Sequence, residues 1–346
     1  MPPSEITYTT VQTAVVHCLT ARRAAFVQDF VPTGAKAIAS TGCISYNGPV
    51  MNTSRTRSYG HDIISLRLGG WSGRALLSDS RGQEFSAAEW ADSLTKPEML
   101  LENSDGILKD DGPACVAVTD LTVANRTLRV VVKRHRPQPG VRSFFRCLRP
   151  GRALRNLKTA LKLMNFGIPV ALPLAAVQNK RGLRATQSIY ITEYIDDSTN
   201  LYNFAVDRLS GLSPGNLATR TQLARQLAAI LAELHKNGFR HRDAKATNFL
   251  VSTDSNGRLS VRLVDMDGIK RYLICRRHRR LRCLWQLAAS LMSVASVNRT
   301  DYLRTFTFYC NLTDVDATER RKLYREIAKL ARAKFERKTA ETASGD

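Results

Sequence analysis

The chain has 346 residues, and its composition, 43% hydrophobic and 24% charged, excludes a wholly disordered protein. Lys and Arg outnumber Asp and Glu by 52 to 30, which gives a formal charge of +22 and predicts an acidic partner: a nucleotide, nucleic acid, anionic lipid headgroups or a phosphorylated glycan. The seven cysteines include no C-x-x-C pair, so neither a disulfide framework nor a zinc site is expected, and a reducing cytosolic compartment is favoured.

Residues 1–60 are rich in Thr, Ser, Ala and Gly, and we expect a poorly ordered leader there; an over-extended start, with Met51 as the first residue, is the alternative. The leader lacks a basic start followed by an apolar core, so no secretory signal is expected. Residues 61–104 are expected to form an N-terminal extension, with a strand over Ile63–Leu68 and a helix that begins near Pro97.

Three short β-prone runs between residues 106 and 134 predict strands, separated by turn sequences. The third run ends as Val-Val-Val-Lys133, where a kinase places the lysine that grips the ATP phosphates. An edge-strand lysine that faces solvent is the alternative. Gly112 lies in the turn expected to cover the phosphates, but no Gly-x-Gly-x-x-Gly loop is present.

Apolar residues at helical spacing predict a basic helix over residues 142–165. A kinase helix at this place carries a Glu that pairs with the phosphate-gripping lysine. This segment contains no Glu, and its candidate inward positions carry Arg155, Asn156 or Lys158. Lys133 therefore needs a different orienting partner, or none.

An extended crossing at residues 167–173 leads to a strand over Ser188–Thr192. Glu193 and Ile195 follow where a hinge peptide would hydrogen-bond adenine, although an ordinary strand end explains them equally well. Residues 217–238 then predict an amphipathic helix with one leucine-rich face, which Gly238 ends.

The stretch from His241 to Gly268 carries the chemistry that phosphoryl transfer requires. In the pattern His-Arg-Asp-x-x-x-x-Asn, Asp243 would orient the attacking hydroxyl and accept its proton, while Asn248 and the later Asp265 would hold magnesium against the phosphates. Lys245 would offset charge on the transferring group. A surface loop that is charged by chance is the alternative.

After Gly268 the chain lacks the Ala-Pro-Glu element of protein kinases, which favours a small-molecule or glycolipid acceptor over a peptide. A basic run over 270–282 is followed by a predicted helix over 284–294. A last amphipathic helix is expected over 318–338, with Leu323, Ile327 and Leu330 inward, before a frayed tail at 339–346.

The segments 241–251, 263–268 and 161–173 together resemble the lipopolysaccharide core kinases, the Kdo/heptose or Kdo/WaaP-type branch of the protein-kinase-like superfamily. The similarity covers roughly residues 105–335. It implies ATP-dependent phosphorylation of an inner-core sugar of lipopolysaccharide at the cytoplasmic membrane face. By position, the resemblance implies that Asp243 is the catalytic base and that Lys245 neutralises charge on the phosphate. It also implies that Asn248 and Asp265 are magnesium ligands and that Lys133 contacts the α- and β-phosphates.

The sequence thus predicts an α+β, bilobal protein-kinase-like fold, with a β-rich N-lobe over 105–195 and a mainly helical C-lobe over 196–338. The expected cofactors are ATP and Mg²⁺, and the expected partner is an anionic glycolipid, with peripheral contact at the inner face of the cytoplasmic membrane. An atypical Ser/Thr protein kinase and a nucleotide-binding pseudokinase or adaptor are the alternatives. Nucleic acid is not an expected partner, because no aromatic-interleaved basic motif or finger spacing occurs.

Overall fold

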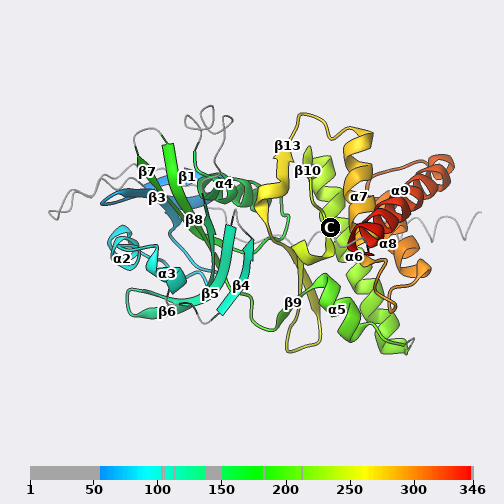
Figure 1. The fold of residues 1–346 in the computed structure, drawn as a ribbon, viewed down its shortest axis with the longest axis horizontal. Helices are drawn as coiled ribbons and strands as arrows, with labels where there is room; N and C mark the ends of the chain where they lie inside the picture. Colours follow the sequence, from blue (N-terminus) through cyan, green and yellow to red (C-terminus); the bar gives the residue numbers. More distant parts are fainter. Residues whose placement is uncertain are drawn as a thin grey trace, which may run out of the picture. The chain divides into compact units, whose positions relative to one another are not determined.

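An antiparallel sheet of eight strands forms the N-terminal part of the described chain (Figure 1). The computed structural model describes residues 55–102, 104, 106–111, 114–136, 150–181, 184–211 and 213–343. All of them belong to a single unit of the chain, Gly42–Asp346.

The strands of this sheet are β1 (Arg55–Ser58), β2 (His61–Leu68), β3 (Trp71–Leu76), β4 (Gly106–Asp111), β5 (Ala114–Val123), β6 (Arg126–His135), β7 (Pro173–Arg181) and β8 (Arg184–Glu193). They lie in the order β1-β2-β3-β7-β8-β6-β5-β4. Because β3 pairs with β7, the segment 61–104, which we expected as an N-terminal extension, contributes strands to the same sheet as residues 106–193.

Alternation along β6 explains why Lys133 faces the interior of the protein. Val130 and Val132 are fully buried in the apolar cluster on one face of the sheet, which α2 (Ala87–Ser93) and α3 (Met99–Glu102) help to form. Since successive side chains of a strand point to opposite faces, Lys133 and His135 share the other face. That face packs against α4 (Arg152–Asn165), which contacts β7 and β8.

The remaining helices are α5 (Leu201–Arg208), α6 (Pro214–Lys236), α7 (Arg277–Leu291), α8 (Arg299–Leu312) and α9 (Ala317–Ala343). Among them lie the short strands β9 (Ser198–Asn200), β10 (Phe239–His241), β11 (Phe249–Thr253), β12 (Leu259–Leu263) and β13 (Ile269–Arg271), with 3-10 turns η2 (Ala246–Asn248) and η3 (Met266–Gly268). The protein therefore has the predicted α+β kinase-like order, a β-rich part followed by a helical part. Among the helices that the structure describes, none is both long and apolar enough to cross a membrane.

The long helix α6 confirms the amphipathic helix expected before the catalytic loop. Ser213 caps its first turn and Pro214 occupies the position where a missing N–H costs nothing. The expected leucine-rich face is buried, including Leu227, Leu231 and Leu234. The helix ends at Lys236, and Gly238 adopts a positive φ of 76° just beyond it.

Three features of the helical part differ from expectation. The second half of the basic run, from Arg277 to Arg282, forms the first turns of α7, which begins at Arg277. Helix α8 was not predicted, although Asn298 and Asp301 form a capping box at its start. Helix α9 continues to Ala343, and Leu330, expected inward, is exposed.

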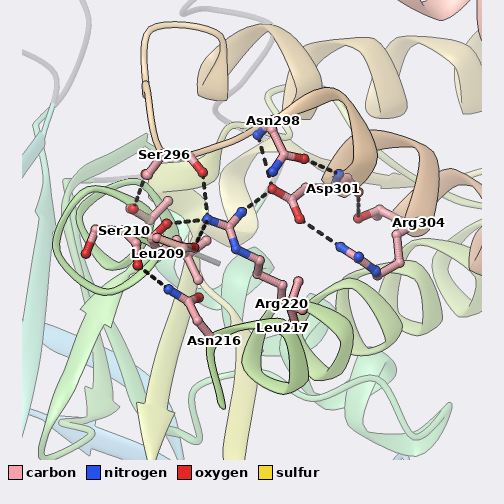
Figure 2. Close-up of polar contacts among 12 residues, drawn as sticks. Leu209, Ser210, Asn216, Leu217, Arg220, Ser296, Asn298, Asp301 and Arg304 are labelled. Carbon is pink, nitrogen blue, oxygen red and sulfur yellow. Dashed lines mark hydrogen bonds and ion pairs between the residues drawn. The ribbon is translucent and has the colours of Figure 1, made fainter. Parts of the chain in front are cut away.

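A buried arginine, Arg220 on α6, joins three elements of the helical part (Figure 2). Its guanidinium donates to the carbonyl oxygens of Leu209, at the end of α5, and of Ser296, the latter at 2.9 Å. It also forms an ion pair with Asp301, which binds Arg304 at 2.8 Å. Because a buried cation without these partners would be strongly destabilising, the network fixes α5 and α8 relative to α6.

Candidate active site

A buried histidine, His241, holds the loop that carries Asp243 through a hydrogen bond. His241, which is 1% exposed, ends β10, and its Nδ1 accepts a hydrogen bond from the Asp243 N–H at 3.2 Å. Gly268 lies against this ring: a Cβ at that position would approach His241 to 2.9 Å. Burial lowers the pKa of His241 to about 4, so the ring is neutral at pH 7 and can accept this bond.

The predicted catalytic residues lie together on this loop. The Asn248 side-chain amide donates to the carbonyl oxygen of Asp243 at 2.7 Å and closes the loop. Lys245 Nζ lies 3.0 Å from Asp243 Oδ2, and both side chains are about half exposed, at 55% and 44%. The main chain of Asp243 is therefore held in place, while its carboxylate is open to solvent beside Lys245.

The lysine from the sheet reaches the second acidic segment. Lys133 Nζ lies 2.7 Å from Asp265 Oδ1 and 2.9 Å from Asp267 Oδ2. Asp265 adopts a left-handed backbone conformation with φ of 61°, at the start of η3. The Val264 N–H donates to the Asn248 carbonyl oxygen at 2.9 Å. The group formed by Lys133, Asp265 and Asp267, which we call the Lys133 cluster, therefore lies next to the Asp243 loop.

In the Lys133 cluster, the attraction between opposite charges affects the pKa values of Lys133 and Asp267 more than burial does. Burial alone would lower the pKa of Lys133, but the carboxylates of Asp267 and Asp265 raise it above its ordinary value. Burial would raise the pKa of Asp267, but His135, Lys133 and a hydrogen bond from Asn156 together lower it. Lys133 and Asp267 are therefore an ammonium and a carboxylate at pH 7.

Asp267 supplies the charge that the helix lacks. Of the three inward candidates on α4, Arg155 and Lys158 are exposed, while Asn156 is 3% exposed. The Asn156 side chain lies 3.4 Å from His135 Nε2 and hydrogen-bonds Asp267. The contact between α4 and the lysine is thus indirect: an amide on the helix holds a carboxylate that pairs with Lys133.

The remaining predicted site residues are Glu193, Ile195 and Gly112. Glu193 is the last residue of β8, where its side chain accepts a hydrogen bond from the Ser80 hydroxyl and its N–H donates to the Leu172 carbonyl oxygen at 2.9 Å. The Ile195 carbonyl oxygen accepts from the Ser198 hydroxyl at 2.6 Å. Gly112 lies outside the described residues.

The oxygen donors beside Lys133 suit magnesium. The Asn248 amide nitrogen is engaged with Asp243, which leaves the amide oxygen as a ligand, and Asp265 adds carboxylate oxygens. The described residues contain no group of three or more His, Cys, Asp or Glu side chains arranged for a metal ion. Two oxygen ligands are nevertheless typical of magnesium in phosphate-transfer sites, where substrate phosphates and water complete its coordination.

The chain has a β-rich part followed by a helical part, and a strand lysine, Lys133, pairs with Asp265 after the Asp243 loop. This arrangement is that of a kinase-family phosphotransferase of the protein-kinase-like superfamily. Residues 141–309 match the family model "Lipopolysaccharide kinase (Kdo/WaaP) family". This region of the chain therefore belongs to the Kdo/WaaP lipopolysaccharide kinases, a family whose kinase activity implies a nucleotide substrate.

Two solved structures are among those similar to the chain. WaaP in complex with acyl carrier protein is 19% identical with a TM-score of 0.49, over 71% of this chain and 97% of that chain. The kinase domain of a Toxoplasma gondii specific rhoptry antigen is 14% identical with a TM-score of 0.37, over 65% of this chain and 82% of that chain. No curated protein matches the chain.

The buried side of the site was not predicted from the sequence, where neither Asp267 nor His135 was given a role. The signal was present for both: Asp267 follows Asp265 by two residues, and His135 lies two residues beyond Lys133 on the same strand. Residues two apart on a strand share a face, so His135 had to lie beside the lysine.

Proposed function

We propose that this protein is an ATP-dependent kinase that transfers the γ-phosphoryl group to a hydroxyl of an inner-core sugar of lipopolysaccharide, Kdo or heptose. The observation that carries the proposal is the contact of Lys133 with Asp265, directly beside the Asp243–Asn248 loop. A strand lysine at this place has nucleotide phosphates as its natural ligand, because it brings a positive charge to a site that already holds metal-binding oxygens.

Each side chain then has a distinct role. Asp243 orients the acceptor hydroxyl and takes its proton, and Lys245 neutralises charge on the transferring group. Lys133 binds the α- and β-phosphates, and Asn248 and Asp265 hold magnesium, whose chemistry is to neutralise charge on the phosphate oxygens. The adenine lies against the backbone from Glu193 to Ile195.

Backbone amides of residues 109–114, which include Gly112, cover the phosphates in this proposal. No Gly-x-Gly-x-x-Gly loop is available for that purpose. Residues 109–111 end β4 and Ala114 begins β5, which pairs with the strand that carries Lys133. The cover and the phosphate-binding lysine would then belong to one continuous piece of sheet.

A glycolipid acceptor is favoured over a peptide by the segment after Gly268. It contains no Ala-Pro-Glu element, and the run from Lys270 to Arg282 is strongly basic. Such a run suits core phosphates or anionic headgroups. The enzyme would then work in the cytoplasm, in peripheral contact with the inner face of the cytoplasmic membrane.

The test is purified protein with magnesium and γ-labelled ATP, offered lipopolysaccharide core glycolipid, free Kdo, free heptose and generic proteins in parallel. We expect label on the core glycolipid that resists removal by washing and depends on magnesium. Label on proteins alone would make the chain an atypical Ser/Thr protein kinase. Nucleotide binding without transfer to any acceptor would make it a pseudokinase or adaptor.

We expect Asp267→Asn to raise the KM for ATP by about tenfold while kcat falls less, because Lys133 loses its second carboxylate and is held less firmly for the phosphates. The measurement is steady-state kinetics with varied ATP, from which KM and kcat are determined separately for label transferred to the acceptor. Asp267→Glu, which keeps the charge, should recover part of the loss.

Asp120→Asn is the matched control, because it removes an exposed carboxylate from the same sheet, 3.6 Å from Arg129. Its kinetics should match those of the parent protein. If Asp267→Asn leaves KM and kcat unchanged, Asp267 does not position Lys133 for catalysis.

A further inference from the structure

The turn between β13 and α7, Tyr272–Arg276, exposes two consecutive aliphatic side chains. Leu273 is 104% exposed and Ile274 69% exposed. Ile107 and Leu108, at 60% and 65%, are a second consecutive exposed pair in the described chain. Isolated exposed aliphatic residues are common on soluble proteins, whereas neighbouring ones that nothing covers indicate a contact surface.

The protein holds this turn in place from both sides. The Tyr272 N–H donates to the Gly238 carbonyl oxygen at 2.8 Å, and a Cβ on Gly238 would lie 2.1 Å from the Tyr272 carbonyl oxygen. Beyond the tip, Cys275 is buried and its carbonyl oxygen accepts from Arg280 Nε at 2.8 Å. The exposed pair is therefore presented between two anchored residues.

An arginine closes the base of the turn. The Arg279 guanidinium lies 3.6 Å from the centre of the Tyr272 ring, and its Nη1 donates to the Ile274 carbonyl oxygen at 3.4 Å. The only ring in the turn is thus occupied by this contact. The aliphatic side chains of Leu273 and Ile274 remain as the outermost groups.

Positive charge flanks the exposed pair in the sequence. No Asp or Glu occurs between Asp267 and Asp301 in the sequence. Arg277 is paired with carboxylates of α9, with 2.6 Å to Glu326. The exposed cations Lys270, Arg276 and Arg282 form no ion pair with any carboxylate of the described residues.

We propose that the Tyr272–Arg276 turn is a membrane-insertion site, at which Leu273 and Ile274 enter the headgroup–acyl boundary of an anionic bilayer while Lys270, Arg276 and Arg282 contact lipid phosphates. Apolar side chains beside basic ones are what an interfacial site requires, since burial and headgroup attraction act together. A nucleic acid would satisfy the charges but would leave the aliphatic pair in water, and the turn offers no free ring for base stacking.

The turn is directly connected to the candidate active site. β13 pairs with β10, with Ile269 opposite His241, and the Arg242 N–H donates to the Gly268 carbonyl oxygen at 2.8 Å. A bilayer bound at the turn would therefore hold the Asp243 loop close to its surface. This inference rests on the proposed function for its purpose, a lipid-anchored acceptor, but bilayer binding needs no phosphoryl transfer and is measured separately.

The test is sedimentation of the full chain with vesicles of phosphatidylcholine, with and without about 30% phosphatidylglycerol. We expect binding only to the anionic vesicles, a loss of at least about tenfold in affinity for the double variant Leu273→Ser/Ile274→Ser, and a similar loss for Arg276→Ser/Arg282→Ser. Ile107→Ser/Leu108→Ser is the matched control, because it removes an exposed aliphatic pair that is followed by Asp110 and Asp111.

A second measurement does not depend on affinity. In the variant Leu273→Trp, the fluorescence of the introduced tryptophan should shift to shorter wavelength on anionic vesicles, because its indole enters an apolar layer. Equal binding of the parent and the Leu273→Ser/Ile274→Ser variant, or binding to RNA or an acidic protein in place of vesicles, would overturn the proposal. Nucleotide binding by the same preparations without vesicles reports on the kinase site, so failure of one proposal is distinguished from failure of the other.

Discussion

Asp243→Asn is expected to lower kcat by about 10²- to 10⁴-fold while nucleotide affinity stays within about threefold of the parent value. The amide has nearly the shape of the carboxylate but cannot accept the proton of the acceptor hydroxyl. The loop should keep its form, because three hydrogen bonds at Asp243 use its main chain: its N–H donates to His241, and its carbonyl oxygen accepts from the Asn248 side chain and from the Lys245 N–H.

The measurement pairs single-turnover transfer of labelled phosphate with nucleotide binding by calorimetry. Asp254→Asn is a suitable control, since Asp254 Oδ1 accepts backbone hydrogen bonds from Asn256 and Arg258 in an exposed turn and an asparagine oxygen can accept both. Turnover of Asp243→Asn equal to that of the control would remove Asp243 from the mechanism.

Asp265→Ala is expected to abolish the dependence of nucleotide affinity on magnesium, with a loss on the order of 100-fold, or about 2.8 kcal/mol, when magnesium is present. In the metal-free protein the loss should be smaller, because no metal ligand is removed there. Asp265 holds Lys133 at 2.7 Å, so its removal, like that of Asp267, leaves the lysine less firmly held for the phosphates.

The experiment is a titration of ATP binding against magnesium for three proteins: the parent, Asp265→Ala and Asp267→Asn. Asp267→Asn should weaken binding to a similar degree with and without metal, because it acts through Lys133 alone. A metal titration of Asp265→Ala that follows the parent curve would show that Asp265 is not a magnesium ligand.

Much of the helical part could be predicted because its signals are local. The spacing of Asp243, Asn248 and Asp265 is a property of short segments, and the leucine-rich face of α6 follows from a period of 3.6 residues. The early start of α7 at Arg277 was missed because a run of arginines resembles a loop. Arginine is nevertheless a good helix former, and here its charge lies on an exposed side of the helix.

The partner of Lys133 could not be predicted from spacing. The lysine and its two carboxylates come from segments more than 130 residues apart, and their contact depends on how the sheet, α4 and η3 pack. The same holds for β3, whose place in the sheet is set by pairing with β7 about 100 residues later. Pairings of this kind are tertiary, and local propensity carries no information on them.

The order of strands has a practical consequence for anyone who trims this protein. The region that matches the family begins at residue 141, yet β7 and β8 within it are flanked by β3 and β6, which precede it. A fragment cut at that point would leave two bare hydrogen-bonding edges beside the apolar side chains of Val177 and Ile191. Bare edges of this kind recruit other chains, so a fragment for expression has to begin before β1 to keep the edges of the sheet as they are in the full chain.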